Sequence, residues 1–459
     1  MKKIYFILLL ILMSNTICLM SQNIVGSWSG ELSVQGAKLP IVFNIKSVND
    51  SLVVTMDSPM QGAKNIPTTY AKFENNQLSI KAIQLMLQYE GVLLNDTVID
   101  GNFTQGGASL PLKLTKGAVK LKRPQEPLPP FSYNSEDIVF NNVVEGFELA
   151  GTLTFPHGDT AFPAVVLISG SGSQNRNEEL FGHKPFLVLA DYLTKNGIAV
   201  LRFDDRGVGQ SKGKSTNATT KDLSTDARSA MEYLKTRKEI DVNKIGLIGH
   251  SEGGCIAFML AAESGDVSFI VSMAGGAIKG DSLLKEQRYM IGIASSQDVN
   301  IISKNEELIT QVEGFIEGKT QPEIFNEIDR FIDSSLMPIA STMMNINSST
   351  KDMLKREMQK LTSPWMRYFM SYDPVNDLRK IKCPVFAING SEDLQVKAST
   401  NLSSIKENAP HAIVKEYEGL NHMFQTCNTG LSNEYSEIEE TISPQVLKDI
   451  SDWINQVVK

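Results

Sequence analysis

The sequence predicts an α/β fold in which helices cover both faces of a mostly parallel sheet, preceded by a small antiparallel all-β domain. Three observations support this prediction. Residues 24–122 form short runs of alternating apolar and polar residues, separated by Gly, Asn, Asp and Pro, without a helical period. A proline-rich stretch follows at residues 123–130. Beyond it, apolar strands alternate with helical segments, which is typical of a parallel sheet buried on both faces.

The first 21 residues are typical of a cleavable secretory signal. Lys2 and Lys3 precede an apolar run at residues 4–13, and a more polar stretch ends before Gln22. The apolar run is shorter than the roughly 20 residues that a membrane-spanning helix needs. We therefore predict a signal peptide at residues 1–21, an extracytoplasmic location (periplasmic or secreted) and no stable membrane span.

Residues 22–122 are expected to form the small all-β domain. Its strands include those near residues 39–45 and 110–114, which show the two-residue alternation of a half-buried strand. Trp28 is expected in the core of this domain. Residues 123–135 are rich in proline and predict a semi-rigid linker that closes the domain.

The strands of the second domain, residues 136–459, are apolar runs rich in Val, Ile and Leu. They are predicted at residues 136–144, 148–155, 164–169, 199–203, 245–248, 269–273, 385–388 and 413–417. The regular alternation stops over about residues 277–378, a long segment of helical composition. An insertion of this kind between two strands commonly forms a lid. Its many methionines suit either an adaptable apolar pocket or the packing of the insertion onto the main domain.

The composition excludes several classes of function. A formal net charge of −8 and the lack of a basic stripe argue against a nucleic acid as partner. The sequence has neither the His-x-His, His-Glu-x-x-His and paired-cysteine motifs of metal sites nor the glycine-rich motifs of nucleotide sites. We therefore expect no metal and no cofactor. We also expect no structural disulfide, because removal of Cys18 with the signal peptide leaves three cysteines, of which at least one is unpaired.

The clearest motif is Gly249-His250-Ser251-Glu252-Gly253, which lies between the apolar run at residues 245–248 and an apolar helical segment at residues 255–261. Gly-x-Ser-x-Gly between a strand and a helix indicates a sharp turn that exposes its serine. The glycines avoid the Cβ clashes that so tight a turn would otherwise create. Ser251 is therefore the predicted nucleophile.

A serine hydroxyl needs a positioned base, usually a histidine, and the chain contains five. His157 and His183 precede the nucleophile in the chain, and His250 lies beside it in the turn. His411 lies before the last predicted strand. His422 follows that strand at its carboxyl end, where open α/β sheets assemble their sites, and is the predicted base.

The third member of such a triad is a carboxylate at the end of a strand between Ser251 and His422. The strand at residues 385–388 leads into Glu392 and Asp393. We expect Asp393 to orient the His422 imidazole, with Glu392 as the competing candidate.

An enzyme that transfers acyl groups also stabilises an oxyanion, chiefly with backbone N–H groups. One predicted donor is the N–H of Glu252, directly after Ser251 at the start of its helix. The second is expected in the loop Ser169-Gly170-Ser171-Gly172, which follows an earlier strand. The Ser171 N–H is the predicted donor, and the Gly172 N–H is the near alternative.

These motifs resemble the α/β-hydrolase superfamily. The resemblance rests on the turn around Ser251, on residues 203–211 and 389–396, and on the loop that holds His422, and it covers about seven tenths of the chain. The whole chain is similar to two-domain secreted bacterial acyl esterases, which are loosely grouped with serine aminopeptidases. The oxyanion loop departs from the more usual His-Gly-x-x form.

The resemblance implies an α/β-hydrolase fold with a helical lid, and a structural role for Asp205 and Arg206 near the active site. The expected activity is cleavage of carboxylic (acyl) esters of small molecules through an acyl-enzyme intermediate, with Ser251, Asp393 and His422 as catalytic residues. One alternative is a serine peptidase of the aminopeptidase-like type, which would need acidic groups to hold a free amino terminus. Another is a glycan- or lipid-binding protein on a hydrolase scaffold. The sequence leaves the oligomeric state open.

Overall fold

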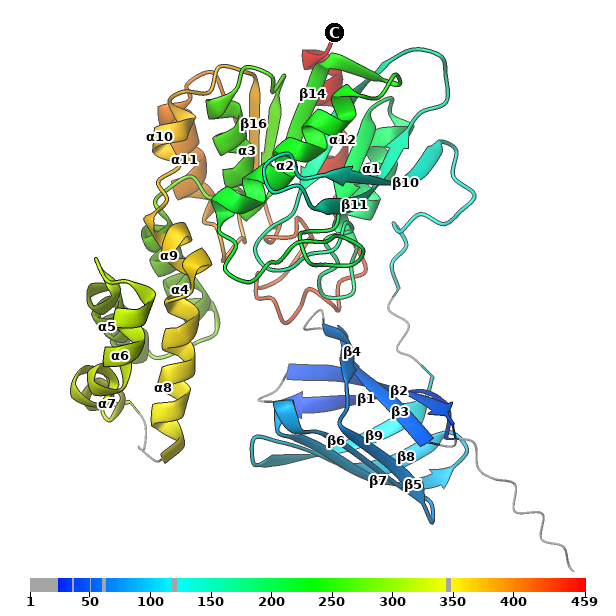
Figure 1. The fold of residues 1–459 in the computed structure, drawn as a ribbon, viewed down its shortest axis with the longest axis vertical. Coiled ribbons are helices and arrows are strands. Elements are labelled where there is room, and N and C mark those ends of the chain that lie inside the picture. Colours follow the sequence, from blue (N-terminus) through cyan, green and yellow to red (C-terminus); the bar gives the residue numbers. More distant parts are fainter. Residues whose placement is uncertain (1–23, 35–36, 50, 60–62, 118–121, 344–347) are drawn as a thin grey trace, which may run out of the picture. The chain divides into compact units, whose positions relative to one another are not determined.

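The computed structural model describes residues 24–34, 37–49, 51–59, 63–117, 122–343 and 348–459 (Figure 1). The chain divides into two compact units, Met1–Lys120 and Leu121–Lys459. The predicted signal peptide at residues 1–21 lies outside the described residues. The structure confirms the predicted fold class: an antiparallel β unit is followed by an α/β unit.

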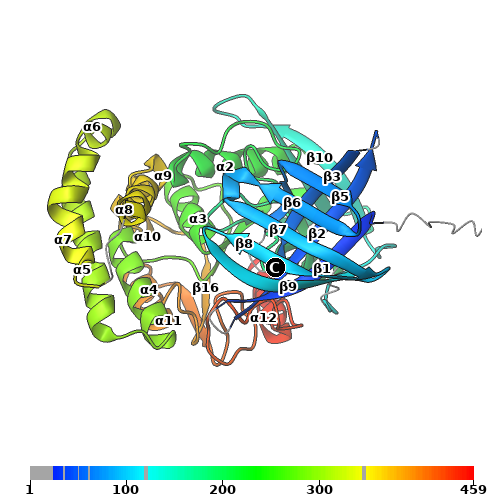
Figure 2. The ribbon, with the colours of Figure 1, turned by 90° about the horizontal axis from the view of Figure 1, so that it is seen from below.

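The first unit is a nine-stranded antiparallel sheet that forms a half-barrel (Figure 2). Its elements are β1 Gly26–Val34, β2 Ala37–Val48, β3 Ser51–Ser58, β4 Ala63–Pro67, β5 Tyr70–Glu74, β6 Gln77–Ala82, the short 3-10 helix η2 Ile83–Leu85, β7 Leu87–Asn95, β8 Val98–Gln105 and β9 Ala108–Lys116. Their order in the sheet is β4-β3-β2-β1-β9-β8-β7-β6-β5. Alternate residues of each strand fill one core. Trp28 is fully buried there, and its Nε1 donates to the Ile24 carbonyl at 2.7 Å.

The second unit contains an eight-stranded sheet in the order β10-β11-β13-β12-β14-β15-β16-β17. The strands are β10 Asn134–Asn141, β11 Glu148–Phe155, β12 Phe162–Ile168, β13 Ala199–Phe203, β14 Ile240–His250, β15 Ile270–Met273, β16 Val385–Gly390 and β17 Ile413–Tyr417. β10 and β11 pair antiparallel with their neighbours, and all pairings from β13 to β17 are parallel. The carboxyl ends of these parallel strands therefore lie along one edge of the sheet.

Helices cover both faces of this sheet. They are α1 Pro185–Lys195, α2 Thr220–Lys235, α3 Glu252–Glu263, α11 Ala398–Asn408 and α12 Pro444–Val457. Val165 and Leu167 of β12 share a core with α1 and α12. Val166 and Ile168 share the opposite core with α2, α3 and α11. This two-sided burial explains why the central strands are continuous apolar runs. No helix in the described part of the chain is long and apolar enough to span a membrane.

The predicted insertion lies between β15 and β16 and is helical. It consists of α4 Gly280–Ala294, α5 Val299–Ile316, α6 Gln321–Phe331, the π-helical turn η3 Ile332–Leu336, α7 Met337–Ala340, α8 Ser348–Leu361, α9 Pro364–Ser371 and α10 Val375–Leu378. The insertion has a core of its own, which contains Met358 and Met370. Met366 lines the cavity described below. Met366 therefore agrees with the predicted apolar pocket, whereas Met358 and Met370 pack within the insertion itself and not onto the main domain.

The predicted linker at residues 123–135 lies on the surface of the second unit. The Arg123 guanidinium donates to five backbone carbonyls, those of Lys122, Phe181, Gly182, Ser436 and Ile438. Gln125 accepts from the Thr441 N–H and donates to the Ile442 carbonyl. The proline-rich segment is therefore anchored to the α/β unit.

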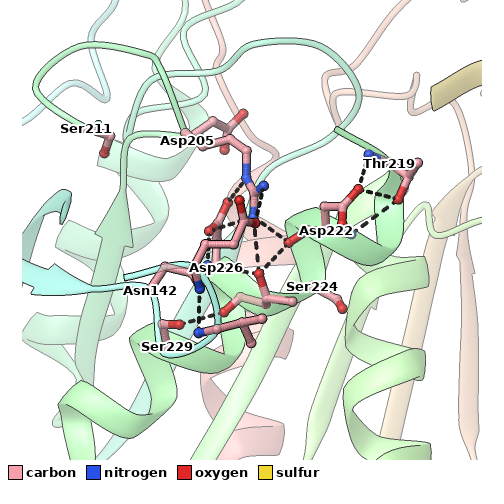
Figure 3. A network of polar contacts seen from close by, with 12 residues as sticks. Asn142, Asp205, Ser211, Thr219, Asp222, Ser224, Asp226 and Ser229 are labelled. Atoms are coloured by element: carbon pink, nitrogen blue, oxygen red, sulfur yellow. Dashed lines mark hydrogen bonds and ion pairs between the residues drawn. The ribbon is translucent and has the colours of Figure 1, made fainter. Parts of the chain in front are cut away.

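A buried ion pair joins the loop after β13 to α2, in the network shown in Figure 3. Arg206 Nε donates to Asp226 Oδ2 at 2.7 Å, and the two side chains are 3% and 2% exposed. Asn142, in the turn after β10, donates to Asp226 Oδ1 at 2.6 Å. Arg206 also donates to the backbone carbonyl of Asp222, whose side chain forms a capping box with Thr219 at the start of α2. The network holds three segments of the chain together.

Replacing Arg206 by Met is expected to lower the free energy of unfolding by about 3–5 kcal/mol, because it leaves the Asp226 carboxylate buried without its cation. Urea denaturation followed by circular dichroism measures the loss. The double variant R206M/D226L is expected to lose less than the sum of the two single variants. Additive losses would contradict a direct coupling between the two side chains.

Candidate active site

Ser251 occupies a strained turn between β14 and α3. Its φ is 53° and its ψ is −117°, a backbone conformation that residues with a side chain rarely adopt. The Ser251 N–H donates to the Met273 carbonyl of β15 at 2.9 Å, and its carbonyl accepts from the Gly254 N–H at 2.9 Å. These two hydrogen bonds keep Ser251 in its strained backbone conformation. Such strained residues are common at functional sites.

The two glycines of the motif permit the close approach of α3 to the sheet. A Cβ atom at Gly249 would lie 2.0 Å from the Gly253 carbonyl oxygen. A Cβ atom at Gly253 would lie 2.1 Å from the Ile168 carbonyl oxygen, at the end of β12. Both distances are far inside van der Waals contact. The spacing Gly-x-Ser-x-Gly is thus a packing requirement of this turn.

The structure brings Asp393 and His422 together at the carboxyl ends of β16 and β17. His422 Nδ1 lies 2.7 Å from Asp393 Oδ2, and the two residues are 4% and 2% exposed. Asp393 Oδ1 accepts from the N–H groups of Gln395 and Val396 at 2.8 and 2.9 Å. Because a carboxylate only accepts, Nδ1 carries a proton, so the neutral imidazole has its lone pair on Nε2. His422 is therefore held in the tautomer that a general base requires.

The other candidates from the sequence lie elsewhere. Glu392 is half-buried, and its carboxylate accepts from the Ser391 hydroxyl at 3.3 Å. His411 is exposed and contacts the Cys383 carbonyl. His183 is buried between Thr441 and the Tyr435 carbonyl, and burial lowers its pKa to about 4. Among the described residues, no group of three or more His, Cys, Asp or Glu side chains could hold a metal ion.

Ser251 and His422 line one cavity of about 510 Å³. Asp393 is not among the lining residues, since it lies behind His422. The insertion supplies an apolar wall to this cavity from α4 and α9, made of Leu283, Leu284, Ile291, Trp365, Met366 and Phe369. The cavity also receives Cys255, whose pKa is raised to about 12 by burial. A thiol that stays protonated is a poor nucleophile.

The two residues predicted to bind an oxyanion, Ser171 and Glu252, line this same cavity, whereas Gly172 lines a neighbouring one. Glu252 is the first residue of α3, so its N–H has no acceptor within the helix. The Gly170 N–H is already engaged, because it donates to Glu178 Oε1 at 2.7 Å. Ser171 and Glu252 therefore stay the predicted oxyanion donors, and the Gly170 N–H is bonded to Glu178.

Asp205 supports the loop that carries Ser171. Its Oδ1 accepts from the Ser169 hydroxyl and its Oδ2 from the Gln174 N–H, both at 2.8 Å. Burial raises the pKa of Asp205 to about 7, and the two hydrogen bonds oppose this shift. Together with the Arg206 network, these contacts agree with a structural role for residues 205 and 206.

A second buried pair, Glu178 and His250, was missed by sequence reasoning. His250 Nδ1 lies 2.9 Å from Glu178 Oε1, and its Nε2 lies 3.0 Å from the His422 carbonyl oxygen. Since both partners only accept, both ring nitrogens carry protons and His250 is an imidazolium. Burial works against this charge, but the Glu178 carboxylate raises the pKa of His250 overall. The pair links the Ser171 loop, the Ser251 turn and the His422 loop.

Glu178→Gln is expected to lower the free energy of unfolding by about 3 kcal/mol or more at pH 6, because it leaves a buried histidine without its counter-ion. His250 has a raised pKa in the folded state. Its ion pair therefore stabilises fully below the ordinary histidine pKa of 6.5, and this contribution is lost as the pH rises through the raised value. The loss should shrink at pH 9.

Urea unfolding at the two pH values measures this difference. Glu179→Gln is the matched control, since the Glu179 carboxylate contacts the Asn175 amide. A loss below about 1 kcal/mol at pH 6 would rule out a charged His250.

Comparison with known proteins agrees with this architecture. A family model described as serine aminopeptidase, S33 matches residues 184–309. Esterase EstD of Thermotoga maritima is 32% identical over 180 residues, which are 38% of this chain and 42% of that protein. An acyl transferase of Shewanella hanedai is 33% identical over 138 residues, 30% of this chain and 41% of that protein. The chain thus spans about two fifths of these two curated relatives.

Among solved structures, an esterase of Pyrococcus furiosus aligns over its whole length with 75% of this chain. The sequence identity is 15% and the TM-score is 0.43. The family match begins at α1 and runs through the glycine-flanked turn into the insertion. The order of the parallel strands is that of an α/β-hydrolase fold, and the family match lies within the unit that has this fold.

Proposed function

We propose that the second unit is a serine hydrolase that cleaves carboxylic (acyl) esters of small molecules. One observation carries the proposal: Ser251, in its strained turn, lines the same cavity as His422, whose Nδ1 is bonded to the buried Asp393 carboxylate. A serine beside a histidine that is oriented by a carboxylate is the arrangement of an activated nucleophile.

In the proposed reaction, Ser251 Oγ attacks the ester carbonyl carbon while His422 Nε2 takes the hydroxyl proton. Asp393 stabilises the imidazolium that forms. The N–H groups of Glu252 and Ser171 bind the oxyanion of the tetrahedral intermediate. When the intermediate collapses, the bond to the alcohol oxygen breaks and His422 gives this oxygen the proton. A water molecule, deprotonated by His422, then attacks the acyl-enzyme and releases the acid.

The apolar wall of the cavity favours a substrate with an apolar acyl group, which would bind against this wall. The wall comes from α4 and α9 of the insertion. A volume of about 510 Å³ lies within the usual range of small-molecule sites. The names of the relatives, an esterase and an acyl transferase, agree with acyl chemistry.

The aminopeptidase alternative receives less support from the cavity. Binding a free amino terminus needs ionised carboxylates, and the carboxyl groups that line the cavity are those of Glu178 and Glu252. Glu178 is already paired with the His250 imidazolium. Burial raises the pKa of Glu252, which favours its neutral form. An ester without an ammonium group therefore fits this cavity better.

Ser251→Ala is expected to lower kcat/KM for ester hydrolysis by about 10⁴-fold or more, because no other group can form the acyl-enzyme. A panel of p-nitrophenyl esters from acetate to decanoate measures the loss and the size of the acyl site. Ser264→Ala, at the far end of α3, is the control and should retain activity. Aminoacyl anilides run in parallel. Their cleavage without ester cleavage would contradict the proposal.

Asp393→Asn is expected to lower kcat by about 10⁴-fold with little change in KM, because the amide no longer favours the proton on His422 Nδ1. Glu392→Gln is the matched control, one residue away, and should leave both constants close to those of the wild type. Steady-state kinetics on the preferred p-nitrophenyl ester distinguishes the two carboxylates. A large loss in Glu392→Gln alone would reverse the assignment.

A further inference from the structure

The cavity that holds Ser251 has a buried apolar end beside α3. Cys255, Gly276 and Leu283 line the cavity there and are all buried, with Cys255 3% and Leu283 5% exposed. Gly276 touches the other two residues, because a Cβ atom on it would lie 2.7 Å from Leu283 Cδ1 and 3.4 Å from Cys255 Sγ. The Cys255 thiol donates to the Gly276 carbonyl at 3.3 Å. We call these three residues the floor of the cavity.

The floor lies close to the nucleophile. Ser251 precedes the first residue of α3, and Cys255 follows it by about one helical turn, which is about 5.4 Å along the axis. Since a carbon–carbon bond is about 1.5 Å long, this distance holds a chain of about four carbon atoms. An acyl chain that points from Ser251 Oγ to the floor is therefore short.

Hydrogen bonds to α11 hold the floor in place. The loop after β15 is fixed on both sides of one peptide: the Ala277 N–H donates to Asn401 Oδ1 at 2.7 Å, and the Ala277 carbonyl accepts from the Ser404 hydroxyl at 2.6 Å. Helix α4, which carries the third floor residue, is bonded to the same helix, because Glu286 Oε1 accepts from the Thr400 hydroxyl at 2.7 Å.

The apolar wall of the cavity is fixed to the nucleophile helix as well. The Trp365 indole N–H of α9 donates to Glu252 Oε1 at 2.8 Å, and Glu252 directly follows Ser251. Floor and wall are thus both held relative to the nucleophile. A longer acyl chain has to displace packed side chains, which is costly in a close-packed interior.

The order of the proposed reaction decides which part of the ester reaches the floor. The alcohol leaves first, while the acyl group stays bonded to Ser251, and water must then enter. The alcohol therefore needs the part of the cavity that opens to solvent, where Ser171 and Ser432 line it and are exposed. Elsewhere the buried lining includes the ion pair of Glu178 and His250, beside which an alkyl chain gains little. The floor is the buried apolar place that remains for the acyl chain.

We propose that Cys255, Gly276 and Leu283 receive the end of the acyl chain and restrict the substrate to short acyl esters, of about four carbon atoms or fewer in the acyl group. The inference rests on the proposed ester hydrolysis and names the class of ester. Gly276 and Leu283 are then specificity-determining residues: the missing Cβ of the one leaves room for the chain, and the side chain of the other ends it.

The test compares kcat/KM for the p-nitrophenyl esters of acetate, butanoate, hexanoate and octanoate. For the wild type, the value for hexanoate is expected to be about tenfold or more below that for butanoate. Leu283→Ala removes the atoms that end the site, and should raise the hexanoate-to-butanoate ratio of kcat/KM about tenfold.

Gly276→Ala makes the opposite change. Gly276 does not have a positive φ, so an alanine fits the backbone. Its methyl group fills the floor and should lower the butanoate-to-acetate ratio of kcat/KM about five- to tenfold. In the double variant G276A/L283A, the side chain that this methyl group meets is shortened, so the ratio should return to within about threefold of the wild type.

Ile293→Ala is the matched control. Ile293 also lies on α4, is 44% exposed and does not line the cavity. Both ratios should stay as in the wild type. Circular dichroism establishes that each variant is folded, and if Leu283→Ala is not, Gly276→Ala decides.

Ratios that stay unchanged in the folded single variants would overturn the inference and leave ester hydrolysis intact. A wild type that prefers hexanoate or octanoate would do the same, because its acyl chain would then run along the wall instead of ending at the floor. If the folded wild type cleaves none of the esters, the proposed function fails together with the inference.

Discussion

The close approach of α3 to the ends of β12 and β14 is the constraint on which the rest of the site depends. The turn between β14 and α3 can form only because residues 249 and 253 lack a Cβ atom, and it forces Ser251 into a left-handed φ. This geometry directs the N-terminus of α3 toward the cavity. Both the nucleophile and the first N–H group of the helix are placed by the same turn, so the site follows from packing as much as from the identity of its side chains.

Buried charged side chains hold the loops around that turn. Asp205 supports the Ser171 loop, and Arg206 and Asp226 join the loop after β13 to α2. The Glu178 and His250 pair links three loops through side-chain and backbone acceptors. Such groups are costly to bury, and each of these is bonded to several partners. The loops that carry the site are therefore fixed by polar contacts, whereas the sheet beneath them is fixed by apolar packing.

The sequence was sufficient for the parts of the molecule that follow from local patterns. The run at residues 199–203 coincides with β13, because buried strands are continuous apolar segments. The run at residues 413–417 coincides with the edge strand β17, in which only Tyr417 is buried. The turn at Ser251 could be predicted from the sequence because its two glycines have a fixed spacing from the serine. Contacts between distant residues had no such signal. Glu178 lies 72 residues from His250, and Trp365 lies 113 residues from Glu252, so only the folded chain brings them together.

The central claim is that Ser251 is an activated nucleophile, and covalent labelling tests it most directly. The folded protein is treated with a fluorophosphonate, which reacts with serines that a histidine has activated, and the adduct is located by mass spectrometry. The account predicts one adduct, on the peptide that contains Ser251, and a slower reaction in His422→Ala. An adduct on another serine, or no adduct in a folded protein, would contradict it.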